Sequence, residues 1–165
     1  MNTLRLSALV GACLFSACNS YSPNSLAPGS SLEDTTRAMG APTADTALPG
    51  AGRRLEFARG PYGKHTYMLD FDAQGRLLRW EQVLVEERFN AIRSGMDGAE
   101  VRAQLGRASD QYVVGWHERQ TVWAYRYETP FCQWFQVGIN TQGKVVDTAY
   151  GPDPLCEVGK VDHSE

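Results

Sequence analysis

The residues in this sequence that could do chemistry are two aspartates beside a turn, three histidines and two late cysteines. Asp70 and Asp72 alternate along an expected strand. Such a pair of carboxylates could act as acid and base, but capping of the turn that follows them is the interpretation we favour. The histidines (His65, His117 and His163) stand far apart, without metal-ligand spacing. Neither a Gly-Xaa-Ser-Xaa-Gly elbow nor a phosphate-binding loop occurs. The sequence therefore predicts no enzyme, no metal and no cofactor.

The beginning of the chain carries a different chemistry. Residues 1–17 contain one positive charge, an apolar run and two small residues before Cys18, which predicts a secretory signal too short to span a bilayer. Residues 14–18 resemble the lipobox of bacterial lipoproteins, which implies a diacylglyceryl thioether and an acylated amine on Cys18. Residues 10–13 also fit that pattern at Cys13, and a third alternative is an ordinary signal that leaves Cys18 free. In bacterial lipoproteins, an aspartate directly after the lipidated cysteine favours retention at the inner membrane. The resemblance therefore implies that this chain, with Asn19 at that position, is sent to the outer membrane.

The two cysteines near the end of the sequence indicate an oxidising compartment outside the cytoplasm. With Cys13 removed and Cys18 lipidated, Cys132 and Cys156 remain, an even number in an exported chain. A hairpin centred on residue 142 would place Cys132 opposite Pro152, and the turn residues that follow can bring Cys156 back. We therefore predict a disulfide, worth on the order of 3 kcal/mol. The alternative is a reactive thiol with His117 as its base.

Three aromatic residues, Trp123, Tyr125 and Tyr127, alternate along one expected strand and so share a face. They suit packing in the core between helices and sheet, which is the interpretation we favour. The alternative is a partner face, in which the aromatic ladder contacts another protein.

The elements that position these residues fall into two similar sets. Gly29 and Gly40 enclose one expected short helix, and Gly95 and Gly106 enclose another, 66 residues later. In each, a polar residue follows the first glycine and can cap the helix, and the second glycine suits a left-handed C-cap. Beyond the helices, apolar alternation and turn residues recur with an offset of 68. Strands are expected at residues 53–59, 64–72, 76–84, 110–116, 121–128, 131–140 and 144–150, with a helical connector at 85–92.

Residues 92–96, with Glu100, Val101, Leu105 and Gly106 and then residues 123–125, resemble the SmpA/OmlA (BamE-like) domain of outer-membrane lipoproteins. The tandem arrangement is similar to the β-lactamase-inhibitor-protein-like fold. The resemblance implies an α+β fold of two tandem repeats, each a short helical stretch packed on an antiparallel β-meander. The expected divisions are a signal peptide (1–17), lipidated Cys18 with a flexible tether (18–27), a first repeat (28–84), a second repeat (85–156) and a polar tail (157–165).

The function that the lipobox and the resemblance imply is non-enzymatic. It is support of β-barrel assembly, or of envelope integrity, through protein contacts at the periplasmic face of the outer membrane. The partner would be a protein, with the β-barrel assembly machine as one candidate, and the lipid anchor would hold the chain to the membrane. The alternative is a periplasmic binding or inhibitor module that acts on another envelope protein. The net charge of −3, with both signs interspersed, excludes a basic nucleic-acid surface.

Overall fold

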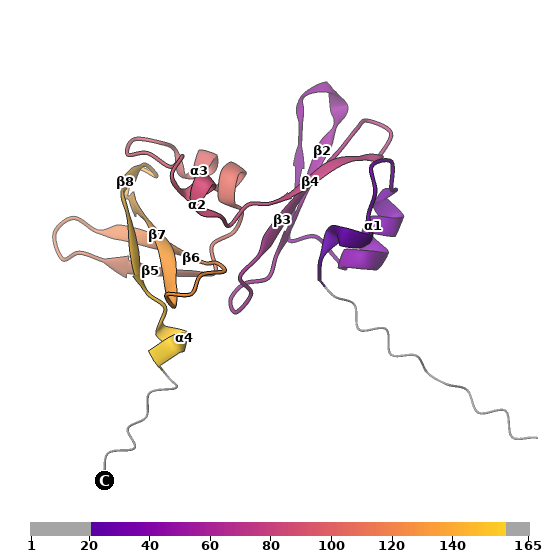
Figure 1. Ribbon diagram of the computed structural model, residues 1–165. Coiled ribbons are helices and arrows are strands. Elements are labelled where there is room, and N and C mark those ends of the chain that lie inside the picture. Colours follow the sequence, from indigo (N-terminus) through magenta and orange to yellow (C-terminus); the bar gives the residue numbers. More distant parts are fainter. Residues whose placement is uncertain (1–20, 158–165) are drawn as a thin grey trace, which may run out of the picture.

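The computed structural model describes residues 21–157, so the signal peptide, the lipidation predicted at Cys18 and the tail from residue 158 lie outside the described residues. Two four-stranded antiparallel sheets dominate the fold (Figure 1). The first sheet contains β1 (Ala44–Ala47), β2 (Arg53–Ala58), β3 (Thr66–Phe71) and β4 (Leu77–Gln82). The second contains β5 (Asp110–Val114), β6 (Gln120–Arg126), β7 (Gln133–Asn140) and β8 (Val145–Pro152). The helices are α1 (Leu32–Met39), α2 (Glu86–Phe89), α3 (Gly98–Leu105) and α4 (Pro154–Glu157), and single 3-10 turns occur at Pro23–Ser25 and Pro49–Ala51.

Both eight-residue helices begin and end on the residues that the sequence indicates. Ser31 caps α1 by accepting a hydrogen bond from the amide of Asp34 at 3.0 Å. At α3, the Glu100 carboxylate accepts from the amide of Asp97 at 2.8 Å. Gly40 and Gly106 end the helices with φ of 80° and 76°. Capping residues are a strong local signal in a sequence because they provide hydrogen bonds for backbone groups that the end of a helix leaves without a partner.

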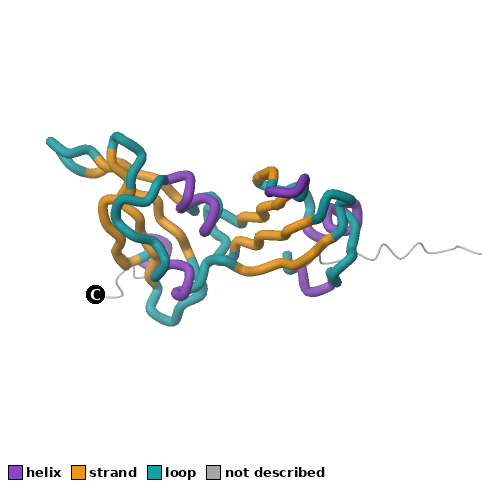
Figure 2. The backbone as a smooth tube through the Cα atoms, turned by 90° about the horizontal axis from the view of Figure 1, so that it is seen from above, coloured by secondary structure: helices purple, strands orange, loops and turns teal. Residues whose placement is uncertain are grey.

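The helices and sheets form successive layers along the long direction of the molecule: α1, the first sheet, α2 with α3, and the second sheet (Figures 1 and 2). One apolar cluster joins α1 to the first sheet and includes Met39, Phe57 and Leu69. A larger cluster joins α2, α3 and the second sheet, and Met68 of the first sheet is part of it. The first sheet therefore has α1 on one face and α3 on the other.

The contact between α3 and the first sheet is also polar. Glu56 accepts a hydrogen bond from the amide of Arg107 at 3.0 Å, just beyond the helix end. A methyl group added at Gly106 would lie 2.9 Å from the Thr66 side chain. Because φ at Gly106 is also positive, both the backbone and the packing require glycine there.

The predicted fold class, α+β with two repeats of a helical stretch on a β-meander, was wrong. Over residues 21–157 the protein is mostly β, built on two four-stranded antiparallel sheets, and its helices are small. Part of the difference is β1, which the sequence analysis did not predict. All four residues of β1 are exposed, so it lacks the apolar alternation that marks a strand, and its pairing with β2 holds it in the sheet. The helical connector also shortens to the four residues of α2.

Two further predictions need correction. Residues 21–27, predicted as part of a flexible tether, pack on the first sheet: Pro23 is buried, and Tyr21 and Leu26 contact the α1 cluster. The predicted hairpin register also fails by one residue, because a bulge between Gly138 and Ile139 shifts β7 against β8. Gln133, not Cys132, therefore faces Pro152. A bulge of this kind leaves no clear signal in the alternation of side chains.

Candidate protein-binding surface

Two of the three aromatic residues of the predicted partner face are buried. Tyr125 and Tyr127 are buried in the core beside α3 and α2, and Trp123 is partly covered by Arg102, whose guanidinium lies 4.9 Å from the ring centre. The Tyr125 hydroxyl donates to the carbonyl of Gly106 at 3.3 Å, and burial raises the pKa of this hydroxyl. Tyr125 and Tyr127 therefore pack in the core, as the favoured interpretation expects, and Trp123 packs against the same cluster with part of its ring exposed.

Four exposed apolar side chains lie instead on the hairpin between β5 and β6, which projects from the side farthest from the first sheet (Figures 1 and 2). Trp116, at its tip, is 92% exposed, and Val113 is 55% exposed. Tyr112 and Val114 are also exposed, and the four residues with Gly115 form one continuous segment. We call residues 112–116 the β5 hairpin. Val113 and Val114 point to opposite faces of β5, and Trp116 lies in the turn beyond them. An exposed Trp with further exposed apolar residues beside it marks an interaction site more often than an isolated apolar residue does.

The rest of the sheet supports the β5 hairpin from behind. The Tyr112 ring stacks on Trp134, with ring centres 6.2 Å apart, and its hydroxyl accepts a hydrogen bond from Gln136 Nε2 at 2.9 Å. The Arg126 guanidinium lies 5.0 Å from the centre of the Trp134 ring. Because β5 is at the edge of its sheet, one side of its backbone has no strand partner in the described fold. Such an edge can receive a strand from another protein.

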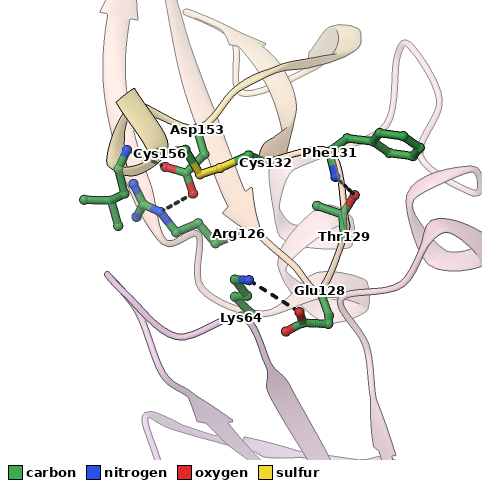
Figure 3. Close-up of a disulfide and its surroundings, with 9 residues drawn as sticks. Lys64, Arg126, Glu128, Thr129, Phe131, Cys132, Asp153 and Cys156 are labelled. Atoms are coloured by element: carbon green, nitrogen blue, oxygen red, sulfur yellow. Dashed lines mark hydrogen bonds and ion pairs between the residues drawn. A yellow bond between two sulfur atoms is a disulfide. The ribbon is translucent and has the colours of Figure 1, made fainter. Parts of the chain in front are cut away.

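The disulfide lies at the other end of β6 from this hairpin. Figure 3 shows the disulfide and its surroundings. The structure joins Cys132 to Cys156, the pair that the sequence predicts. The amide of Asp153 donates to the carbonyl of Cys132 at 3.0 Å, so the cross-link and this hydrogen bond together hold the end of β8 on the β6–β7 loop. The Phe131 ring points away from the disulfide. Cys132 is therefore not the free thiol of the alternative interpretation.

A buried ion pair stabilises the same end. Arg126 Nε donates to Asp153 Oδ2 at 2.7 Å, and the two side chains are only 7% and 9% exposed. Arg126 also donates to the carbonyl of Pro61, in the loop between β2 and β3 of the first sheet. Lys64 in that loop and Glu128 form an exposed ion pair at 3.4 Å. This end therefore ties the two sheets together.

The residues that could do acid–base chemistry have structural partners. Asp70 is paired with Arg54 and Arg79 at 2.6 and 2.9 Å, and its hydrogen bonds to Arg54 hold the pKa of its carboxyl below the usual range. Asp72 caps the turn by accepting from the amides of Gln74 and Arg76 at 3.0 and 2.8 Å. The turn-capping interpretation is correct for Asp72, and the structure adds an ion-pair role for Asp70 that the spacing did not predict.

The histidines lie apart. His65 stacks on Tyr67, His117 is exposed on the turn of the β5–β6 hairpin, and His163 falls outside the described residues. Within residues 21–157, no group of three or more His, Cys, Asp or Glu is placed to hold a metal ion. In the same part of the chain, no helix has the length and apolar character needed to cross a membrane.

The signal that could have identified the β5 hairpin is the composition of residues 112–116. Four of these five residues are large and apolar, without the alternation of a strand that buries one face. When consecutive residues of a strand and the turn after it are all apolar, they cannot all face the core, so some of them point to solvent. The sequence analysis used the segment only as a strand.

Comparison with known proteins does not assign the chain to a family. No family model matches the chain, and no curated protein matches it. Among solved structures, the chain is similar to a cysteine-rich secretory protein from Staphylococcus aureus, at 10% sequence identity and a TM-score of 0.26. The match covers 78% of this chain but only 45% of that protein.

Proposed function

We propose that this protein is a lipid-anchored, non-enzymatic component of the periplasmic face of the outer membrane, and that it supports β-barrel assembly by binding another protein through the β5 hairpin. The anchor rests on the lipobox-like residues that end at Cys18. The disulfide between Cys132 and Cys156 suits an exported protein, since disulfides persist in oxidising compartments. The barrel-assembly role rests on the resemblance of residues 92–106 and 123–125 to the SmpA/OmlA domain.

The observation that carries the binding role is the exposure of Trp116 at the tip of the β5 hairpin. Burying a Trp side chain of about 250 Å² at about 25 cal/mol per Å² favours association by roughly 6 kcal/mol before the costs of binding are subtracted. Trp116, in the turn after β5, offers a side-chain anchor, and the edge strand β5 beside it offers backbone groups for a partner strand.

The proposal is tested by photo-crosslinking in cells. A benzophenone amino acid is placed at position 113 of the full-length, C-terminally tagged chain, and the captured proteins are identified. Position 78 on β4, an edge strand of the other sheet, is the matched control, because Leu78 is 56% exposed and Val113 is 55% exposed. We expect a discrete crosslinked protein from position 113 and not from position 78.

The identity of the captured protein separates the two functions. Capture of barrel-assembly subunits, with loss of barrel proteins and detergent sensitivity when the gene is deleted, supports the barrel-assembly role. Capture of a different periplasmic protein with an intact envelope would instead assign a separate binding or inhibitor module. Equal capture from positions 113 and 78 would contradict binding through the β5 hairpin.

A further inference from the structure

The chain enters the fold beside the loop between β2 and β3. The Arg59 guanidinium lies over the Tyr21 ring, 3.2 Å from its centre, and the Tyr21 ring is 6.4 Å from that of Phe57 and 6.3 Å from that of Tyr67. Pro23, two residues later, is buried. Tyr21 is therefore fixed to the first sheet near the end of β2 and the beginning of β3.

Very little chain separates this point from the predicted lipid. Only Asn19 and Ser20 lie between Cys18 and Tyr21. Three Cα-to-Cα steps of about 3.8 Å span at most about 11 Å. Since the acyl chains on Cys18 would lie in the hydrocarbon of the bilayer, this length holds Tyr21 within the thickness of the headgroup layer or just outside it.

The loop between β2 and β3 at this end has the composition of a membrane-facing segment. The loop of residues 59–65 contains Arg59, Lys64 and His65 and no acidic residue. Tyr62 in this loop is 73% exposed. Cationic side chains favour anionic lipid headgroups, and Tyr is enriched where a membrane meets water.

The neighbouring loop, between β6 and β7, contributes a second exposed aromatic. The Lys64–Glu128 pair at 3.4 Å and the Arg126 hydrogen bond to the Pro61 carbonyl place this loop against residues 59–65 (Figure 3). Phe131 in this loop is 76% exposed. Glu128, which would repel anionic headgroups, has Lys64 as its partner.

We propose that the end formed by residues 59–65 and 127–132 lies against the bilayer surface in the lipid-anchored protein, with Tyr62 and Phe131 at the headgroups. This orientation rests on the proposed lipid anchor at Cys18. The β5 hairpin lies at the other end of β6, about 20 Å from these two loops, because β6 is seven residues long. One end would then hold the bilayer while the other binds a protein.

The test uses the full-length lipidated protein in vesicles of phosphatidylethanolamine with a minority of phosphatidylglycerol. A benzophenone amino acid is placed at position 62, 131 or 116, and crosslinked phospholipid is measured by mass spectrometry. Position 116 is the control because Trp116 is more exposed than either loop residue but lies at the far end of β6. We expect several-fold more lipid on positions 62 and 131 than on 116, and loss of that labelling in Cys18→Ser.

The outcomes separate the orientation from the anchor. Acyl groups on the Cys18 peptide, with equal labelling at the three positions or more at 116, would overturn the orientation and leave the lipid anchor intact. A Cys18 peptide without acyl groups would overturn both. Labelling of positions 62 and 131 that persists in Cys18→Ser would show that the two loops bind lipid without the acyl groups on Cys18. That result would overturn the proposal that the short segment between Cys18 and Tyr21 holds this end at the bilayer.

Discussion

Replacing Arg126 by methionine should destabilise the protein more than the loss of any surface ion pair. Arg126 and Asp153 are almost fully buried and joined at 2.7 Å. Arg126→Met keeps most of the side-chain volume over Trp134 but leaves the Asp153 carboxylate buried without its cation. Removing one partner of a buried pair typically costs about 3–5 kcal/mol, because the remaining charge has lost its water as well as its partner.

The assay is urea unfolding of Cys18→Ser protein with the disulfide intact, followed by tryptophan fluorescence. With an m-value of about 1.5–2 kcal/mol/M, a loss of about 3–5 kcal/mol lowers the midpoint by about 2 M. Lys144→Met is the control, because Lys144 and Asp97 lie 2.8 Å apart but are about half exposed. That surface pair should contribute no more than about 1 kcal/mol.

The double variant Arg126→Met with Asp153→Asn provides the sharper comparison. If the pair acts as a unit, the double variant should lose at least about 1 kcal/mol less than the sum of the two single losses. A midpoint for Arg126→Met equal to that of Lys144→Met would refute the reasoning, since a buried carboxylate without its cation cannot be so well tolerated. Additive single losses would show that the two side chains stabilise the fold independently.

Three further perturbations test other parts of the fold. Cys132→Ser with Cys156→Ser should lower the free energy of unfolding by about 3.5 kcal/mol, as expected for a loop of this length, and equal stability with and without reductant in the parent protein would contradict the cross-link. Because pairing lowers the pKa of Asp70 from its ordinary value of 3.8, its stabilising contribution is present above that value and is lost as the pH falls through the folded-state pKa. Asp70→Asn should flatten the stability profile in this acidic range, and an unchanged slope in acid titrations followed by circular dichroism would argue against the pair. Gly106→Ala should cost about 1–3 kcal/mol more than Gly40→Ala in urea unfolding, because both have similar positive φ but only Gly106 packs against the first sheet. Equal losses would mean that α3 does not contact the first sheet there.

The features that the sequence predicted best are those set by local chemistry. Turn residues and alternating apolar side chains located seven of the eight strands, and the capping residues located both eight-residue helices. The cysteine pair was found for a related reason, since the turn that returns Cys156 to Cys132 is encoded in the residues between β8 and α4. The strand that was missed, β1, is held by its pairing with β2 alone.

The features that it missed depend on contacts between distant segments. The alternation of Trp123, Tyr125 and Tyr127 shows that they share a face but not whether that face is covered, and α2 and α3 cover it. Tyr21 was assigned to a flexible tether because nothing beside it in the sequence is apolar enough to form a core. Its partners, Arg59 and Phe57, lie almost forty residues further along the chain.

Binding of a protein through the β5 hairpin is tested most directly by measuring how much of the partner captured from position 113 co-purifies with Trp116→Ala and with Leu78→Ala. A Trp at the centre of an interface typically accounts for at least about 2 kcal/mol, or roughly thirty-fold in affinity. We expect Trp116→Ala to lose nearly all of the partner and Leu78→Ala to retain it. Retention of the partner by Trp116→Ala at the level of the unchanged protein would contradict the proposed binding surface.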